Sequence, residues 1–343
     1  MRALSIDGPS RLSFREIPEP SPRSGEAMIE IAYIGYCGSD LNSFRGLNPL
    51  VSYPRIPGHE ISGMIAALGE GAPGHLAVGQ SVTILPYFNC GACNACRLGR
   101  PNACKNNETM GVQREGALAR FVCVPCEKVI PVDGMRQRDL ALVEPLAVGF
   151  HAVARADVAK GERVVVLGCG VIGLGALLGA KRRGAETLVV DVSAAKLERA
   201  LALGADVAVD ASREDVAAAV AKFGGAMGPQ AVIEAVGATQ TFQQAIDLVA
   251  SCGRVVYVGY AKEKVAYETR FFLMKEIDIR GSRGSTREDF EHVIDYLRSH
   301  SGAGDVIISR IASFDEAPQA MIDWDRDPGA FTKVMIELDG RHG

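Results

Sequence analysis

Between residues 163 and 281, short runs rich in valine and isoleucine alternate with helix-forming segments. Strands of this composition, separated by helices, pair in parallel and need a helical layer on each face. The pattern therefore predicts an α/β fold with a doubly wound parallel sheet. The expected strands are RVVVL, TLVVD, ADVAVD, QAVIEAV, RVVYVG and IDIRG, and the expected helices lie near residues 171–183, 194–203, 213–223, 239–250 and 268–275.

A glycine-rich segment, GCGVIG, follows the first of these strands and opens the first helix. Its first glycine permits a tight turn, the second lets a pyrophosphate approach the backbone, and the third lets helix and strand pack closely. The helix N-terminus supplies free N–H groups for the phosphates. A glycine-rich turn of another doubly wound domain is the alternative interpretation. We expect a dinucleotide to contact Gly168, Gly170, Val171, Ile172 and Gly173.

An acidic residue, Asp191, ends the next strand, 23 residues after Gly168. A carboxylate at this place can bind the hydroxyls of the adenosine ribose and would repel a 2′-phosphate. The sequence therefore favours NAD over NADP, with Lys196 near the adenosine end. Ligands of parallel sheets bind beyond the carboxyl ends of the strands, so Val258 and Ser282 are further expected neighbours of the cofactor.

Residues 1 to about 147 differ in character, because many glycines and prolines separate short apolar runs. The expected strands here are AMIEIAYIGY, ISGMIAAL, SVTILP and ALARFVCVP, which indicate a mostly β domain with long loops. After the parallel sheet, an amphipathic helix is expected over TREDFEHVIDYLRSH and a final strand over KVMIEL.

Four cysteines with the spacing C-x2-C-x2-C-x7-C lie in one loop: Cys90, Cys93, Cys96 and Cys104. Four thiolates at such separations can close a tetrahedral shell around one zinc ion. Unrelated free cysteines are usually scattered, and the C-x3-C-P ending of the bacterial iron–sulfur run is absent. Since four protein ligands leave no open position, we expect a structural zinc that stabilises the loop.

A second set of metal-ligand residues is dispersed along the chain. Cys37 lies in GYCGSD, His59 and Glu60 lie in PGHEISG, and Glu144 lies in VEPLAVGFHA. A catalytic zinc needs three protein ligands and one open position, which a cysteine, a histidine and a carboxylate can supply. Spacing alone does not prove this site, because a single histidine or glutamate is more often structural.

These motifs occur in an order that resembles the zinc-dependent medium-chain alcohol dehydrogenases over essentially the whole chain. The branch with sorbitol, threonine and sugar-acid dehydrogenases, such as those for L-idonate or galactonate, is the most similar. The resemblance implies a GroES-like catalytic domain, residues 1–147 and 285–343, and a Rossmann NAD-binding domain, residues 148–284. It places the active site in the cleft between them.

The resemblance implies that Cys37 and His59 bind the catalytic zinc, and that either Glu60 or Glu144 completes the set. The family's proton acceptor would be Ser39, for which capping of a local backbone group is the alternative role. Relatives of the sorbitol type often carry a histidine where this chain has Asn42, and an asparagine cannot take up a proton near neutral pH. The proton would then leave through ordered water, the nicotinamide ribose or another side chain.

The substrate is expected to be the secondary alcohol of a polyol, a sugar acid or a similar polar metabolite. Arg283 follows the last parallel strand, and a guanidinium suits a carboxylate, although a cofactor contact or a surface ion pair is an alternative. Asn48, in a loop that the resemblance places near the site, is a second candidate for substrate contact. The rival functions are a zinc-free quinone or enoyl reductase and a non-catalytic binding or regulatory relative.

Composition excludes several other classes of function. The chain has 343 residues and a formal net charge of -4 without a basic block, which argues against nucleic acid as a partner. The opening MRALSIDGPSRLSF lacks the apolar core of a signal peptide, and no run approaches the ~20 apolar residues of a membrane span. Nine cysteines then indicate thiols and metal rather than disulfides, and a cytoplasmic protein. The resemblance implies a homotetramer or homodimer.

Overall fold

A computed structural model describes residues 1–338 of the chain. It divides into two compact units, of which the first comprises Met1–Glu144 and the chain from Leu297 onwards, and the second comprises Pro145–Tyr296. The chain enters the second unit within helix α4 (Val143–Ala156) and leaves it within α10 (Arg287–Ser299). The domain limits expected above, at residues 147/148 and 284/285, stay a prediction about the family's two domains. The last five residues of the expected range 285–343, residues 339–343, lie outside the described part.

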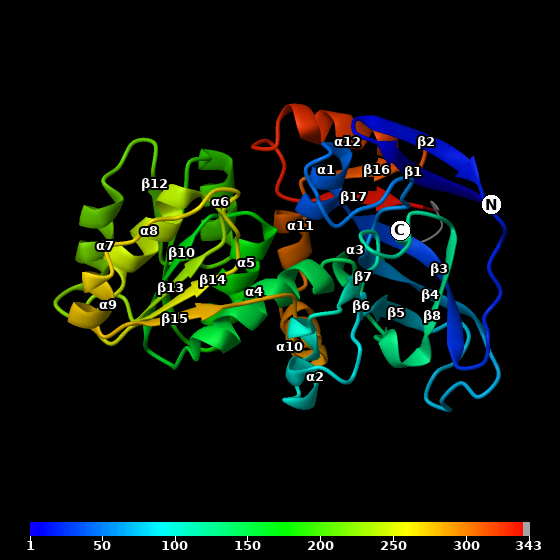
Figure 1. Ribbon diagram of the computed structural model, residues 1–343, viewed down its shortest axis with the longest axis horizontal. Helices are drawn as coiled ribbons and strands as arrows, with labels where there is room; N and C mark the ends of the chain where they lie inside the picture. The colour runs from blue at the N-terminus through cyan, green and yellow to red at the C-terminus, as the bar shows by residue number, and fades with distance from the viewer. Residues whose placement is uncertain (339–343) are drawn as a thin grey trace. The chain divides into compact units, whose positions relative to one another are not determined.

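The second unit contains a six-stranded sheet in the order β12-β11-β10-β13-β14-β15, in which every pair is parallel (Figure 1). This confirms the expected doubly wound sheet. Its strands are β10 (Arg163–Leu167), β11 (Glu186–Asp191), β12 (Val207–Asp210), β13 (Ala231–Glu234), β14 (Arg254–Tyr257) and β15 (Asp278–Gly281). Its further helices are α5 (Val171–Arg182), α6 (Ala194–Ala202), α7 (Val216–Gly224), α8 (Thr239–Leu248) and α9 (Arg270–Lys275).

The strand order reverses direction between β10 and β13, which are neighbours in the sheet. In open parallel sheets, ligands bind beyond the carboxyl ends of the strands at such a switch point. Gly168 follows β10 and Ala235 follows β13. The glycine-rich segment therefore lies where a dinucleotide site is expected.

The first unit is built on a seven-stranded sheet in the order β16-β17-β3-β4-β5-β9, with β8 paired to β3. The final strand, β17, pairs antiparallel with β3, so the end of the chain completes the N-terminal sheet. The strands are β3 (Glu26–Gly35), β4 (Glu60–Leu68), β5 (Ser81–Ile84), β8 (Phe121–Pro125), β9 (Val129–Pro131), β16 (Arg310–Ser313) and β17 (Val334–Glu337).

Shorter elements surround this sheet. Two hairpins are formed by β1 (Arg2–Gly8) with β2 (Arg11–Glu16), and by β6 (Tyr87–Phe88) with β7 (Glu108–Thr109). The helices are α1 (Gly38–Phe44), α2 (Asn94–Arg97), α3 (Gln137–Leu140), α11 (Ala303–Ile307) and α12 (Ala317–Arg326), with 3₁₀ turns at Pro101–Ala103 and Cys126–Lys128.

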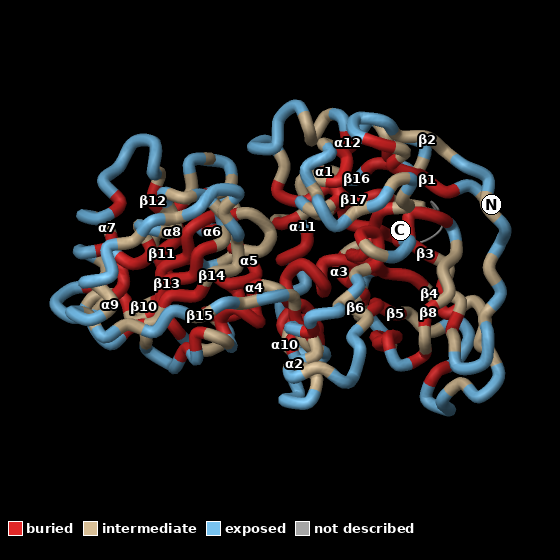
Figure 2. The backbone as a smooth tube through the Cα atoms, in the orientation of Figure 1, coloured by how far each residue is buried: buried red, intermediate tan, exposed pale blue. Residues whose placement is uncertain are grey.

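Each unit has its own apolar core, as the buried backbone through both sheets shows (Figure 2). In β3 burial alternates at first and then becomes continuous from Ile31 to Gly35, as expected for a strand that becomes covered on both faces. This buried end of β3 leads directly to Cys37. Among the described residues, no helix has the length and apolar character that crossing a bilayer requires.

Candidate active site and metal centres

Cys37 is the residue at which the chain leaves β3 and enters α1. The buried carboxylate of Asp40 accepts a hydrogen bond from the Cys37 backbone N–H at 2.9 Å and one from Gly58 N–H at 3.4 Å. Asp40 therefore ties the turn at Cys37 to the segment that precedes His59. We did not single out Asp40 from the sequence, although an acidic residue three positions after a helix N-cap was the available signal.

Glu60 is the first residue of β4 and is paired with Gly35 of β3. A Cβ atom at Gly35 would lie 2.0 Å from Oε2 of Glu60, so only glycine leaves room for the carboxylate. The Cys37 Sγ, a ring nitrogen of His59 and a carboxylate oxygen of Glu60 all lie within 4.8 Å of one another. Residues proposed from two separate motifs, GYCGSD and PGHEISG, are thus brought together.

Glu60 also forms a buried ion pair. The ammonium of Lys333 lies 2.6 and 2.5 Å from its two carboxylate oxygens and donates to the Tyr36 carbonyl at 2.8 Å. Burial raises the pKa of Glu60 to about 7, against the opposing charge of Lys333. Lys333 could not be predicted from a local pattern, because it lies 273 residues from its partner.

Glu144 lies in the first turn of α4 and is 4% exposed. Its Oε1 accepts a hydrogen bond from the Tyr87 hydroxyl. Among the described residues, the compact ligand group contains Glu60 and not Glu144. The charge of Glu144 nevertheless raises the pKa values of both His59 and Glu60, so this second carboxylate is close to the group.

The electrostatics around His59 suit a cation. Its Nδ1 is buried and has no hydrogen-bond partner in the described part of the chain. Burial opposes protonation of the ring, but Cys37, Asp40 and Glu144 raise the pKa of His59 well above its ordinary value. A divalent metal would neutralise such a concentration of acidic groups. The donor set, one thiol, one imidazole and one carboxylate, is that of an open zinc site.

Ser39, the expected proton acceptor, is the second residue of α1. Its Oγ is buried without a hydrogen-bond partner among the described residues, whereas its carbonyl accepts from Ser43 Oγ at 2.8 Å. The hydroxyl is therefore not used as a local cap, which was the alternative role.

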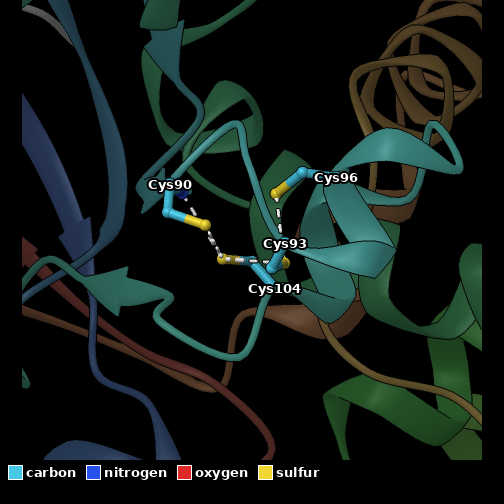
Figure 3. A group of neighbouring side chains, drawn as sticks. All are labelled: Cys90, Cys93, Cys96 and Cys104. Carbon is cyan, nitrogen blue, oxygen red and sulfur yellow. Dashed lines mark hydrogen bonds between the residues drawn. The ribbon is translucent and has the colours of Figure 1, made fainter.

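The four cysteines of the loop converge (Figure 3). Sγ of Cys104 lies 3.5 Å from that of Cys90 and 3.8 Å from that of Cys93, which is 3.6 Å from Cys96. Zn–S bonds of about 2.3 Å place sulfur atoms of a tetrahedron roughly 3.8 Å apart, so the geometry fits one zinc. Backbone N–H groups, that of Cys96 first, lower the pKa of Cys93 to about 6, whereas burial raises that of Cys96 to about 11.

The glycine-rich segment has a backbone conformation and close contacts that require glycine at two positions. Gly168 has φ +97°, and a Cβ atom at Gly173 would lie 1.8 Å from the Gly168 carbonyl oxygen. At Gly170, by contrast, an added Cβ would meet nothing within 4 Å, which leaves space for a phosphate. Asp191, at the end of β11, accepts from the N–H groups of Cys169 at 2.7 Å and Ser193 at 2.9 Å. These residues fit a dinucleotide.

The remaining expected cofactor neighbours also lie at the ends of the second unit's elements. Lys196 lies in the first turn of α6. The backbone N–H of Val258 donates to Glu234 and that of Ser282 to Tyr257, each at 2.9 Å, while Ser282 Oγ is buried without a partner among the described residues.

The two expected substrate residues have different surroundings. The Asn48 amide is hydrogen-bonded to nearby residues: Nδ2 donates to Ser43 Oγ of α1 at 3.0 Å, and Oδ1 accepts from Leu50 N–H at 3.1 Å. Arg283 is exposed and lies just beyond β15.

Comparison with known proteins identifies the two halves. The alcohol dehydrogenase GroES-like domain family matches residues 23–134, and the zinc-binding dehydrogenase family matches residues 171–299. L-galactonate-5-dehydrogenase of Escherichia coli K12 is 38% identical over 294 residues, covering 85% of this chain and 86% of the relative. Sorbitol dehydrogenase of Halalkalibacterium halodurans is 33% identical, covering 94% and 96%.

Solved structures agree. RspB of Escherichia coli CFT073, complexed with NADH, has a TM-score of 0.90 at 28% identity, covering 98% of this chain and 99% of its own. A zinc-binding dehydrogenase of Sinorhizobium meliloti 1021, bound to NADP, has a TM-score of 0.89 at 31% identity, with the same coverage. The chain therefore belongs to the zinc-type medium-chain alcohol dehydrogenases, with a GroES-like domain and a zinc-binding dehydrogenase domain.

Proposed function

We propose that this protein is a zinc-dependent, NAD-linked dehydrogenase that oxidises a secondary alcohol of a polyol or sugar acid. The observation that carries the proposal is the group of Cys37, His59 and Glu60, whose ligand atoms lie within 4.8 Å of one another. Relatives named for L-galactonate and sorbitol support the substrate class.

Cys37 and His59 would hold the catalytic metal together with one carboxylate. Glu60 already shares both oxygens with Lys333, and Glu144 shares one with Tyr87. To bind a metal, either carboxylate would have to give up its present hydrogen bond or share an oxygen between its present partner and the metal. Both carboxylates therefore stay candidates. The second metal would be held by the four-cysteine group, where four thiolates leave no position for substrate.

When bound, zinc supplies a Lewis acid for the substrate hydroxyl and NAD supplies the hydride acceptor. This chain's own residues would orient the substrate, exclude water and move the proton. The unpartnered hydroxyl of Ser39 would accept the substrate's hydroxyl proton and pass its own proton outwards. Because Asn42 cannot carry the proton further, the route would continue through water or the cofactor ribose.

The nucleotide half would bind NAD along the Gly168–Gly173 segment, where Gly170 leaves room for the pyrophosphate. Asp191 would face the adenosine ribose and disfavour a 2′-phosphate. Arg283 and Asn48 would contact substrate, and a carboxylate-bearing substrate would suit the guanidinium of Arg283.

A screen for NADH formation tests this function. Polyols, hexonates and amino alcohols are supplied to zinc-loaded protein with NAD or NADP. We expect turnover of a secondary alcohol with NAD, lost when a chelator removes the metal. Turnover that survives complete metal removal would indicate the zinc-free reductase, and no turnover in any class would favour a non-catalytic relative.

Ser39→Ala tests the proton step, with Ser43→Ala as the matched control in the same helix. Loss of a positioned acid or base typically costs about 10²- to 10⁴-fold in rate. We expect Ser39→Ala to lower kcat by about this factor. Ser43→Ala, which removes only hydrogen bonds to Ser39 O and Asn48, should change kcat much less. Equal effects of the two changes would remove Ser39 from the proposed step.

The expected cytoplasmic location and the homodimer or homotetramer also stay proposals, supported by the family resemblance. Light scattering on the purified protein determines the assembly directly, and a monomer would contradict it.

A further inference from the structure

We propose that Tyr87 is a positioning residue that links the four-cysteine loop to Glu144 beside the proposed catalytic metal site. The inference rests on the proposed function in one respect: Cys37 and His59 must hold a metal whose binding depends on the position of the Glu144 carboxylate. It assigns to the loop a role beyond stability, because the state of the loop would determine how firmly the catalytic metal is held.

The loop begins and ends at one short ladder. Tyr87 and Phe88 of β6 pair with Thr109 and Glu108 of β7, and the Pro86 carbonyl extends the ladder by accepting from Met110 N–H at 3.1 Å. Residues 89–107, which carry all four cysteines, leave and return through this ladder. A metal bound by the cysteines fixes the loop from within, and the ladder fixes its base.

Successive side chains of a strand point to opposite faces, so Phe88 and Tyr87 make their contacts on opposite faces of the ladder. On one face, the Arg114 guanidinium lies 4.1 Å and the Lys128 ammonium 5.5 Å from the centre of the Phe88 ring. Arg114 also pairs with Glu108 of the facing strand at 3.1 Å. On the other face, the Tyr87 hydroxyl donates to Glu144.

Glu144 depends on this hydrogen bond because it is almost fully buried, and a buried carboxylate is costly without donors. The bond fixes the direction of the carboxylate. Glu144 is one of the two carboxylates that would complete the ligand set with Cys37 and His59, so a change in its direction would alter how firmly the metal is held. Loss of a hydrogen-bond partner behind a metal ligand typically costs about 10- to 100-fold in metal affinity.

The direct test is Tyr87→Phe, which removes only the hydroxyl. Tyr33→Phe is the matched control, because it removes another partly buried tyrosine–carboxylate hydrogen bond of the first unit, to Glu337 at 2.6 Å. Zinc-loaded full-length proteins are exposed to dipicolinate, and the zinc remaining per chain is followed with time. In Tyr87→Phe we expect one of two zinc ions to leave about 10 to 100 times faster, with the other unchanged. Tyr33→Phe should release both at the wild-type rates.

A second arm tests the link to the loop. Cys96→Ser, which breaks the four-cysteine group, should speed loss of the remaining zinc when Tyr87 is present and add nothing in the Tyr87→Phe background. If Cys96→Ser does not fold by circular dichroism, Phe88→Leu replaces it, because it loosens the ladder without removing a ligand. The visible spectrum of the cobalt-substituted protein provides a second readout, which should shift in Tyr87→Phe and stay unchanged in Tyr33→Phe.

Three results would overturn the inference. Unchanged zinc release in Tyr87→Phe, or independent effects of the loop and Tyr87 changes, would refute it while the proposed function stands. A wild-type protein that binds only one zinc per chain would refute both.

Discussion

The ammonium of Lys333 bridges both carboxylate oxygens of Glu60, at 2.6 and 2.5 Å, and the two side chains are 2% and 0% exposed. This pair joins the start of β4 to the residue before β17, 273 positions apart. Desolvation largely offsets the attraction within a buried ion pair, but removal of one partner leaves an uncompensated charge. Lys333 therefore holds the Glu60 carboxylate in place beside Cys37 and His59.

Lys333→Met should destabilise the protein strongly. Breaking a buried pair typically costs about 3–5 kcal/mol, and urea unfolding of the zinc-loaded protein measures the loss. The double variant Lys333→Met/Glu60→Gln serves as the control, because it removes both charges of the pair and should recover part of the stability. A single variant within about 0.5 kcal/mol of the wild type would show that the pair is not maintained in solution.

The pairing of Asp289 with His151 predicts that the stability of the second unit depends on pH. Burial opposes ionisation of this carboxyl group, but hydrogen bonding and charge from His151, 2.8 Å away, together with Thr286, hold the pKa of Asp289 below its ordinary value. A lowered pKa contributes stability above the unfolded value, about 3.9, and the contribution is lost as pH falls through the folded value.

Asp289→Asn should therefore lower Tm at neutral pH, and the difference from the wild type should shrink below about pH 4. Thermal unfolding between pH 3 and 7 measures this, with the exposed Glu263→Gln as control. A difference that stays constant over the whole range would refute the ionic contribution of Asp289.

Asp191 predicts the preference for NAD. Hydrogen bonds to charged groups contribute about 1.5–3 kcal/mol, which corresponds to roughly 10- to 100-fold in affinity. Asp191→Ala should reduce the ratio of kcat/KM for NAD over NADP by about this factor. Because Asp191 also holds Cys169 and Ser193 N–H groups, activity with both cofactors is measured, and only the ratio is diagnostic. An unchanged ratio would remove Asp191 from cofactor selection.

The four-cysteine loop predicts a separate effect on stability. Cys93→Ser should lose one zinc per chain and lower Tm, by roughly 5–10 °C if a few kcal/mol are lost. Cys123→Ser, which changes a half-buried cysteine of β8 outside the group, is the control. Equal zinc content and Tm in both variants would contradict a structural metal in this loop.

Local sequence patterns predicted the parallel sheet because each of its strands and helices is marked by the composition of its own short segment. Each of the six expected strands is present, and α5 begins directly after the glycine-rich segment. Helix α4 was missed, since VEPLAVGFHAVARA lies at a domain junction and its N-terminal residues were interpreted only as a ligand motif.

Contacts between distant residues could not be predicted. The partners in Lys333–Glu60, Tyr87–Glu144 and His151–Asp289 are 273, 57 and 138 positions apart, and nothing in the local pattern of either residue indicates the other. His151 of α4 pairs with Asp289 of α10, and both residues belong to the second unit. The choice between Glu60 and Glu144 as metal ligand stays open, because each already has a hydrogen-bond partner.

The most direct measurement is zinc per chain, by elemental analysis, in wild-type protein and in Cys37→Ser. Our account predicts two zinc ions in the wild type and one in Cys37→Ser, with the fold retained by circular dichroism and alcohol oxidation abolished. One zinc in the wild type, or two zinc ions with near-normal turnover in Cys37→Ser, would contradict a catalytic metal at Cys37 and His59.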